Sequence, residues 1–131
     1  MTFTGFIEGL EKRTGMYVGE VTFQTVSTYL LGYQMCCHVH HLDDPFDGID
    51  ELIRCRLGRR CSLHWTYIIR QFFAEDEESA IPLIFSSIHD LQRLKAEKGR
   101  AWLKSESDRM EKFKRARPVN PSWPFHNSDQ P

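Results

Sequence analysis

The apolar residues between positions 76 and 98 recur at the spacing of one face of a long α-helix, and this run constrains the fold more than any other segment. Acidic residues at its start suit the positive end of a helix, and Pro82 falls within its first turns. Such a helix is stable only when other apolar elements cover it. Its predicted buried positions are Ile81, Ile84, Phe85, Ile88, Leu91 and Leu94.

Other segments with helical periodicity predict a mainly α-helical, compact, single-domain bundle with no strand outside residues 16–18. Thr2 or Thr4 would cap the first predicted helix, at residues 3–13, and Gly58 would end the one at 47–58, which has the clearest helical pattern. The helix at 22–38 has apolar residues on several sides, which predicts a central helix packed on more than one side. The predicted helices cover residues 3–13, 22–38, 47–58 and 102–113. The segment 62–73 fits a strand or a helix, and a helix is favoured because its neighbours are helical.

A short extended strap is expected at residues 15–19, between the first two helices. Gly15 and Gly19 can both take a positive φ and would form its two corners. Met16 and Tyr17 would then pack on the core, so the segment would serve as a structural connection.

The length and amino-acid composition of the chain are typical of a single globular domain. The chain has 131 residues with 40% hydrophobic and 27% charged residues, and a net charge of −1. We expect the helical domain at residues 1–117 and an irregular, extended, Pro-rich tail at 118–131, held by Trp123 and Phe125. No secretion signal or membrane span is expected, and the four cysteines do not suggest a disulfide framework. The sequence therefore predicts a cytoplasmic protein with free thiols.

The segment KRTGMYVGE, at residues 12–20, is locally similar to the start of the ATPase domain of the DNA gyrase B subunit. In that family the next helix supplies a glutamate base and an asparagine that holds magnesium. Residues 21–41 contain no Asp, Glu or Asn, and no glycine-rich phosphate loop follows. The ATPase interpretation is therefore rejected.

Other chemistry receives little support from the sequence. Cysteines and histidines gather at 36–64 and could ligate zinc, but the usual paired spacing is missing. Cys61 and His64 could form a nucleophilic pair, yet no further motif supports one. The basic segment 95–117 could contact nucleic acid through Trp102 and Phe113, although the net charge argues against it. We expect no enzyme activity, no catalytic residue, no metal and no cofactor.

Four short motifs occur along the chain in a recognisable order: RTGMYVG at 13–19, YLLGY at 29–33, HWTYII at 64–69 and DEESAIPLIF at 76–85. In these motifs the chain resembles small bacterial immunity proteins of polymorphic and contact-dependent toxin systems. Thr14 stands where that group usually has proline, and the resemblance covers about residues 10–95. It implies that the protein binds and neutralises a cognate protein toxin. A non-enzymatic adaptor or regulatory domain is the main alternative, and a small metal-dependent enzyme is a further one.

Two acidic clusters are the predicted partner-binding residues, because inhibitors of nucleic-acid-cleaving toxins often meet a basic cleft. If the loops that carry them lie together, their charges would steer association. Phe46 is the predicted apolar anchor, and the basic face at 95–117 is the alternative surface. The predicted residues are Asp43, Asp44, Phe46, Asp47, Asp50, Glu51, Glu75, Asp76, Glu77 and Glu78.

Overall fold

The structure, a computed structural model, describes residues 2–112 and 118–125. Over this part of the chain it has seven α-helices and no strand, which confirms the predicted mainly α-helical fold. A π-helical turn, η1, continues α5 directly and covers Ile69–Phe73. The α-helices are α1 (Phe3–Lys12), α2 (Thr14–Val18), α3 (Phe23–Val39), α4 (Ile49–Leu57), α5 (Trp65–Ile68), α6 (Glu77–Glu97) and α7 (Arg100–Lys112).

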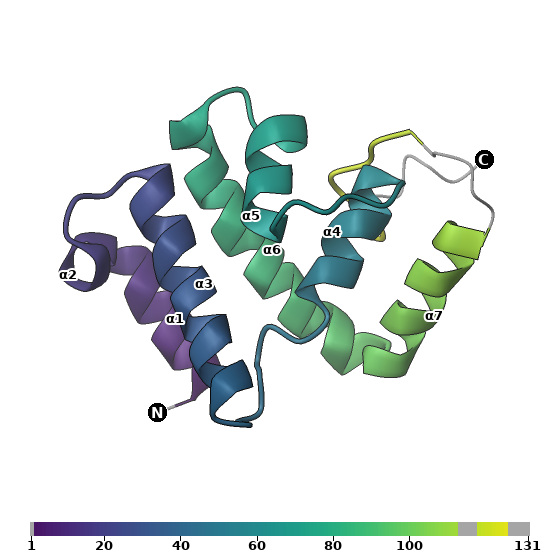
Figure 1. The fold of residues 1–131 in the computed structure, drawn as a ribbon, viewed down its shortest axis with the longest axis horizontal. Helices are drawn as coiled ribbons and strands as arrows, with labels where there is room; N and C mark the ends of the chain where they lie inside the picture. The colour runs from purple at the N-terminus through teal and green to yellow at the C-terminus, as the bar shows by residue number, and fades with distance from the viewer. Residues whose placement is uncertain (1, 113–117, 126–131) are drawn as a thin grey trace.

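Helix α6, the long helix that the apolar periodicity of residues 76–98 predicts, forms the centre of the fold. It runs diagonally through the molecule, with α1 and α3 on one side and α4 and α7 on the other (Figure 1). Its inward side chains are buried, and the predicted Ile81 is half-buried at the edge of the core. The buried apolar residues of α6 are Ala80, Ile84, Phe85, Ile88, Leu91 and Leu94.

Side-chain caps define where three helices begin. The Asp76 carboxylate accepts from the Ser79 amide at 2.7 Å, and the Asp76 amide donates to the Ser79 hydroxyl at 3.1 Å. Thr22 makes the same reciprocal arrangement with Thr25 at the start of α3. Thr2 accepts from the Gly5 amide and begins α1. Each cap satisfies backbone donors that have no partner within the helix.

The predicted strap at residues 15–19 is wrong, because the segment folds into the short helix α2. Gly15 lies inside this helix, and only Gly19 has the expected positive φ, of 78°. The Gly19 amide closes α2 by donating to the Gly15 carbonyl at 3.0 Å. Met16 is 81% exposed and does not pack on the core, whereas the Tyr17 ring contacts Phe6 and Tyr29.

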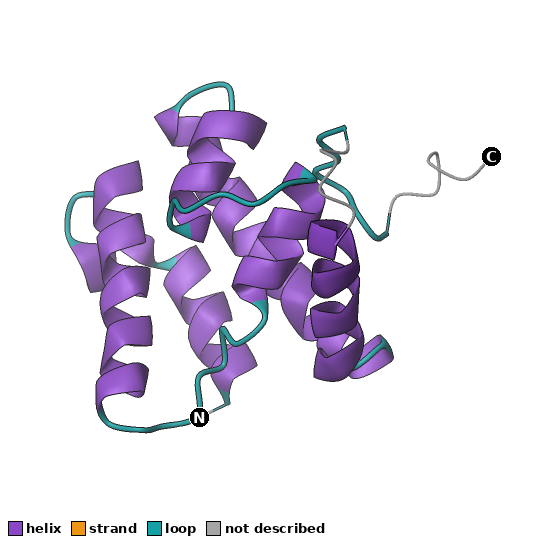
Figure 2. Cartoon of the chain, turned by 45° about the vertical axis from the view of Figure 1, so that its right-hand side comes forward, coloured by secondary structure: helices purple, strands orange, loops and turns teal. Residues whose placement is uncertain are grey.

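Helix α3 lies along one edge of the molecule, so the prediction that it is central is wrong, although it does pack on more than one side, against α2 and α6 (Figure 2). One face of α3 buries Phe23, Val26 and Leu30. The apolar residues on the other face remain exposed. The reason is that α6, with 21 residues, takes the central place.

The ambiguous segment before α6 is helical, as the sequence favours. Its first turn, α5, is capped by His64, and η1 then ends at Phe73. Helix α4 begins at Ile49, two residues later than predicted, and Gly58 ends it with a φ of 81°.

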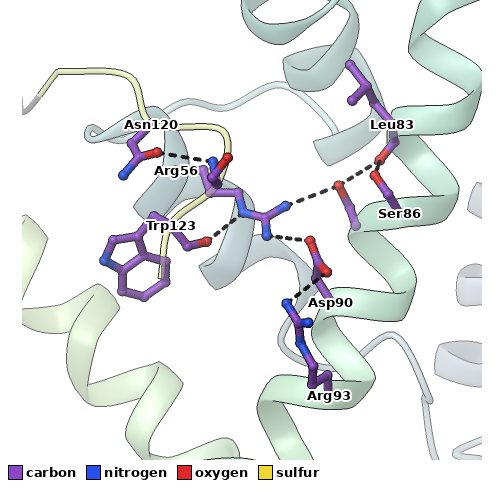
Figure 3. Close-up of polar contacts among 9 residues, drawn as sticks. Arg56, Leu83, Ser86, Asp90, Arg93, Asn120 and Trp123 are labelled. Carbon is purple, nitrogen blue, oxygen red and sulfur yellow. Dashed lines mark hydrogen bonds and ion pairs between the residues drawn. The ribbon is translucent and has the colours of Figure 1, made fainter. Parts of the chain in front are cut away.

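Residues 118–125, called here the C-terminal segment, fold back over α4, α6 and α7. The Asn120 amide donates to the Arg56 carbonyl at 2.7 Å, and Arg56 Nε donates to the Trp123 carbonyl at 2.8 Å (Figure 3). The Trp123 ring stacks on Trp102 with centroids 5.7 Å apart, and Arg93 lies over the Phe125 ring. Trp123 and Phe125 thus make the contacts expected of them, although residues 121–125 form turns instead of the predicted extended chain. Residues 113–117 and 126–131 of the predicted helix and tail lie outside the described residues.

Candidate functional site

An exposed apolar stripe runs along α3. Leu31, Met35 and Val39 are spaced four residues apart and therefore lie on one face of the helix. Their exposed fractions are 40%, 51% and 61%, and Leu42, just after the helix, is 59% exposed. Single exposed apolar residues are ordinary on a protein surface, whereas several of them close together mark a candidate interaction surface.

The turn after α3 brings this stripe to an acidic loop. His41 has a φ of 55°, and the Leu42 amide donates to the Cys37 carbonyl at 2.9 Å, so the chain reverses tightly. Asp43 follows Leu42 and is exposed. The Asp44 carboxylate accepts from the Phe46 amide at 2.8 Å, which fixes the loop. We call Leu31, Met35, Val39, Leu42, Asp43 and Asp44 the α3 surface.

The rest of the first acidic cluster is tied into the fold by basic residues. Arg100 bonds both carboxylate oxygens of Asp47, at 3.0 and 3.2 Å, and bonds Glu51 at 2.8 Å. The Lys95 ammonium donates to the carbonyls of Pro45 and Asp47. These contacts hold the start of α4 against α6 and α7, so Asp47 and Glu51 have a structural role.

Asp50 is half-buried and faces a different environment. Burial raises the pKa of its carboxyl above the ordinary value, although Arg54 and His64 lower it. A desolvated carboxyl at this position is poorly placed to meet a partner in solution.

The second acidic cluster, at residues 75–78, lies at the start of α6. All four side chains are exposed, and the bonds from Ser79 hold the pKa of Asp76 below its usual range. Lys95 contacts the first cluster from the other end of α6. At 1.5 Å per residue, about 27 Å of helix separates the two regions. The loops that carry the two clusters therefore do not lie together, and the condition for one shared acidic face is not met.

Phe46 cannot serve as the exposed anchor, because it is 1% exposed. Its ring packs edge-on against Phe3 and Tyr33, with centroids 5.2 and 5.7 Å away, and lies 6.2 Å from Trp65. The Asp44 bond to its amide turns the chain inward at this point. Phe46 belongs to the core where α1, α3 and α5 meet. The role of exposed apolar anchor, which was predicted for Phe46, is better suited to Leu42, which is exposed.

The cysteine- and histidine-rich segment does not come together as a metal centre. Among the described residues, no three His, Cys, Asp or Glu side chains are placed to hold a metal ion. Cys36 is exposed, whereas Cys37 and Cys55 are buried. Burial raises the pKa of the Cys37 thiol, which keeps it protonated and unreactive.

His64 takes part in a buried polar network. Its Nδ1 lies 2.7 Å from the Thr66 hydroxyl, which is 2.6 Å from the Ser27 hydroxyl. Its Nε2 lies 3.3 Å from Gln34 Oε1, which also accepts from the Trp65 indole at 2.9 Å. Nδ1 also accepts from the Thr66 amide, so the neutral Nε2–H tautomer satisfies every contact. The network connects α3 to α5.

The comparisons with protein families, curated proteins and solved structures gave no match for this chain. No helix in the described part is both long and apolar enough to cross a membrane.

Proposed function

We propose that this protein is a cytoplasmic immunity protein that binds and neutralises a cognate bacterial toxin through the α3 surface. The observation that carries the proposal is the apolar stripe of Leu31, Met35, Val39 and Leu42, which is exposed and continuous with an acidic loop. The resemblance of four sequence motifs to immunity proteins supports the choice of partner. The proposal assigns no catalytic step to the chain.

The composition of the α3 surface suits a protein partner. Interfaces commonly have an apolar centre that becomes fully buried and a polar rim that stays wet. Met35 and Val39 would provide the centre, and Asp43 would lie in the rim. A basic partner would complement this rim, and the charges would act mainly on the rate of association.

A growth-protection assay tests the function. The immunity function predicts a large toxin gene directly upstream of this one. The C-terminal domain of that toxin is expressed under an inducible promoter, with and without this chain. We expect the wild-type chain to restore growth, and the Met35→Asp variant to lose protection because a charge would enter the centre of the interface. Unimpaired toxicity in the presence of folded wild-type protein would contradict the immunity function.

A non-enzymatic adaptor or regulatory domain is the second candidate, since the α3 surface favours protein binding without specifying inhibition. The two functions separate in the same assay. An adaptor would bind its partner through Met35 and Val39 and leave toxin-dependent growth arrest unchanged.

A further inference from the structure

A cleft lies on the other side of the molecule, away from the α3 surface. It is bounded by α4, η1, α6 and the C-terminal segment, with a cavity volume of about 400 Å³. Ser86 on its lining is exposed, so the cleft opens to solvent. This volume falls within the usual range for small-molecule sites.

The polar side of the cleft is built around a buried arginine. Arg56 is 3% exposed, and its guanidinium lines the cavity. Its Nη2 bonds the Asp90 carboxylate at 2.7 Å, but its Nη1 reaches the Ser87 hydroxyl only at 3.4 Å (Figure 3). The contact of Nη1 with Ser87 is at the long limit for a hydrogen bond, so replacing it with a bond to a ligand would cost little.

The cleft carries one more positive than negative charge. The Arg93 guanidinium also lines it and lies 3.5 Å from the second oxygen of Asp90, so two guanidinium groups share one carboxylate. Burial lowers the pKa of the Arg56 guanidinium below its ordinary value; Asp90 opposes this shift and Arg93 adds to it. A further anion in the cavity would offset the unfavourable burial of this charge.

The remaining walls are apolar. Phe73, Leu83 and Phe125 line the cavity, and the Phe125 ring lies 3.7 Å from the Arg93 guanidinium carbon. An apolar group entering the cleft would therefore pack on these side chains while its charged end faces Arg56.

We propose that this cleft binds a small organic monoanion, a carboxylate attached to a flat apolar body, through Arg56 and Arg93. The carboxylate accepts from Arg56 Nη1 and from Arg93, and the apolar body packs against Phe73, Leu83 and Phe125. A monoanion would neutralise the single excess charge, whereas a dianion would leave the cleft with a net negative charge. This site is independent of toxin binding and goes beyond the proposed function.

Two-dimensional NMR titration of the full chain tests the proposal with three probes at constant ionic strength: benzoate, its neutral analogue benzamide, and inorganic phosphate. We expect saturable shifts of the Ser86 and Phe125 amides and the Trp123 indole with benzoate. Benzamide and phosphate should bind at least about tenfold more weakly, because benzamide lacks the negative charge and phosphate lacks the apolar body.

Two arginine variants provide the matched comparison. Arg93 and Arg109 each pair with an acidic residue three positions earlier in a helix, and their side chains are 52% and 64% exposed. Arg93→Gln should weaken benzoate binding about five- to tenfold, the size expected for one charge-assisted contact. Arg109→Gln should leave it unchanged.

Ser86→Trp offers a second variant that leaves both arginines in place. Ser86 is exposed and its hydroxyl donates only to its own helix, at Leu83, among the described contacts, so the larger side chain should fill the cleft without unfolding the domain. It should abolish the benzoate shifts. Non-saturating shifts, equal binding of benzamide, tighter binding of phosphate, or unchanged binding by Arg93→Gln would each overturn the proposal.

Discussion

At the scale of single residues, His64 should make stability depend on pH. Burial lowers the pKa of His64, and Asp50 raises it by less. The unfolded chain therefore takes up a proton below about pH 6.5, where the folded chain still resists it. Stability is fully present above this pH and falls as the pH decreases toward the folded pKa.

The His64 prediction is measured by urea denaturation between pH 5 and pH 8. Burial raises the pKa of Asp50, whose contribution has the opposite sign because it is lost as pH rises. The difference between wild type and His64→Gln isolates the histidine, and His40→Gln is an exposed control. An equally steep loss of stability in His64→Gln would show that another group is responsible.

Asp90 should matter far more to stability than a similar carboxylate on the surface. Asp90→Ala leaves the buried Arg56 guanidinium without its closest anionic contact, so we expect a loss of about 3 kcal/mol in the free energy of unfolding. Asp108 pairs with Lys104 at 3.2 Å, but both side chains are more than 60% exposed. Asp108→Ala should cost less than about 0.5 kcal/mol. Equal losses in urea denaturation would mean that the Arg56 pair contributes no more than a surface pair.

At the scale of elements, Gly48 and Gly99 provide a comparison of backbone strain with steric crowding. Both have positive φ, of 104° and 89°. A Cβ at Gly48 would lie 3.1 to 3.3 Å from Leu103, Leu91 and Arg100, whereas one at Gly99 would meet nothing within 4 Å. Gly99→Ala should cost about 1–2 kcal/mol from the backbone alone.

Gly48→Ala should exceed the cost of Gly99→Ala by at least about 1 kcal/mol, because α4, α6 and α7 would have to move apart. Thermal or urea denaturation of the two variants measures the difference. Equal costs would indicate that this junction is looser than the structure shows.

The element scale also explains how much the sequence could predict. The cap at Asp76 and the apolar period of α6 are local signals, and they located that helix within one residue. Helix α3 has apolar residues on all sides, and such a pattern does not distinguish a central helix from a surface helix that awaits a partner. The sequence therefore could not identify Met35 and Val39 as an exposed stripe.

Phe46 and the acidic clusters show the same limit at longer range. The sequence placed Phe46 in a polar loop, but its burial depends on Phe3 and Trp65, which are far away in the chain. The separation of the clusters follows from the contact of Lys95 with the start of α4, and no local pattern contains that contact. The Arg56 cleft was missed for this reason, since Asp90 and Trp123 reach it from other segments.

At the scale of the whole molecule, charge and apolar contact should affect partner binding differently. Asp43 is exposed, whereas Asp44 also holds the Phe46 amide, so Asp43→Lys changes the charge without removing that bond. We expect Asp43→Lys to slow association with the toxin domain several-fold at low salt. Near 1 M salt the association rate of the variant should equal that of wild type. Stopped-flow or surface-based kinetics across salt concentrations would measure this. An unchanged association rate would remove the acidic loop from the interface and make the basic face at residues 95–117 the candidate.

The dissociation constant of Val39→Asp for the cognate toxin domain tests the central claim most directly. Val119→Asp is the matched control, because Val119 is also exposed, at 44% against 61%, but lies on the C-terminal segment on the other side of the molecule. If the α3 surface is the interface, Val39→Asp should raise the dissociation constant about 100-fold, and Val119→Asp should change it by less than about twofold. A Val39→Asp variant that stays folded and binds the toxin as tightly as wild type would contradict the account.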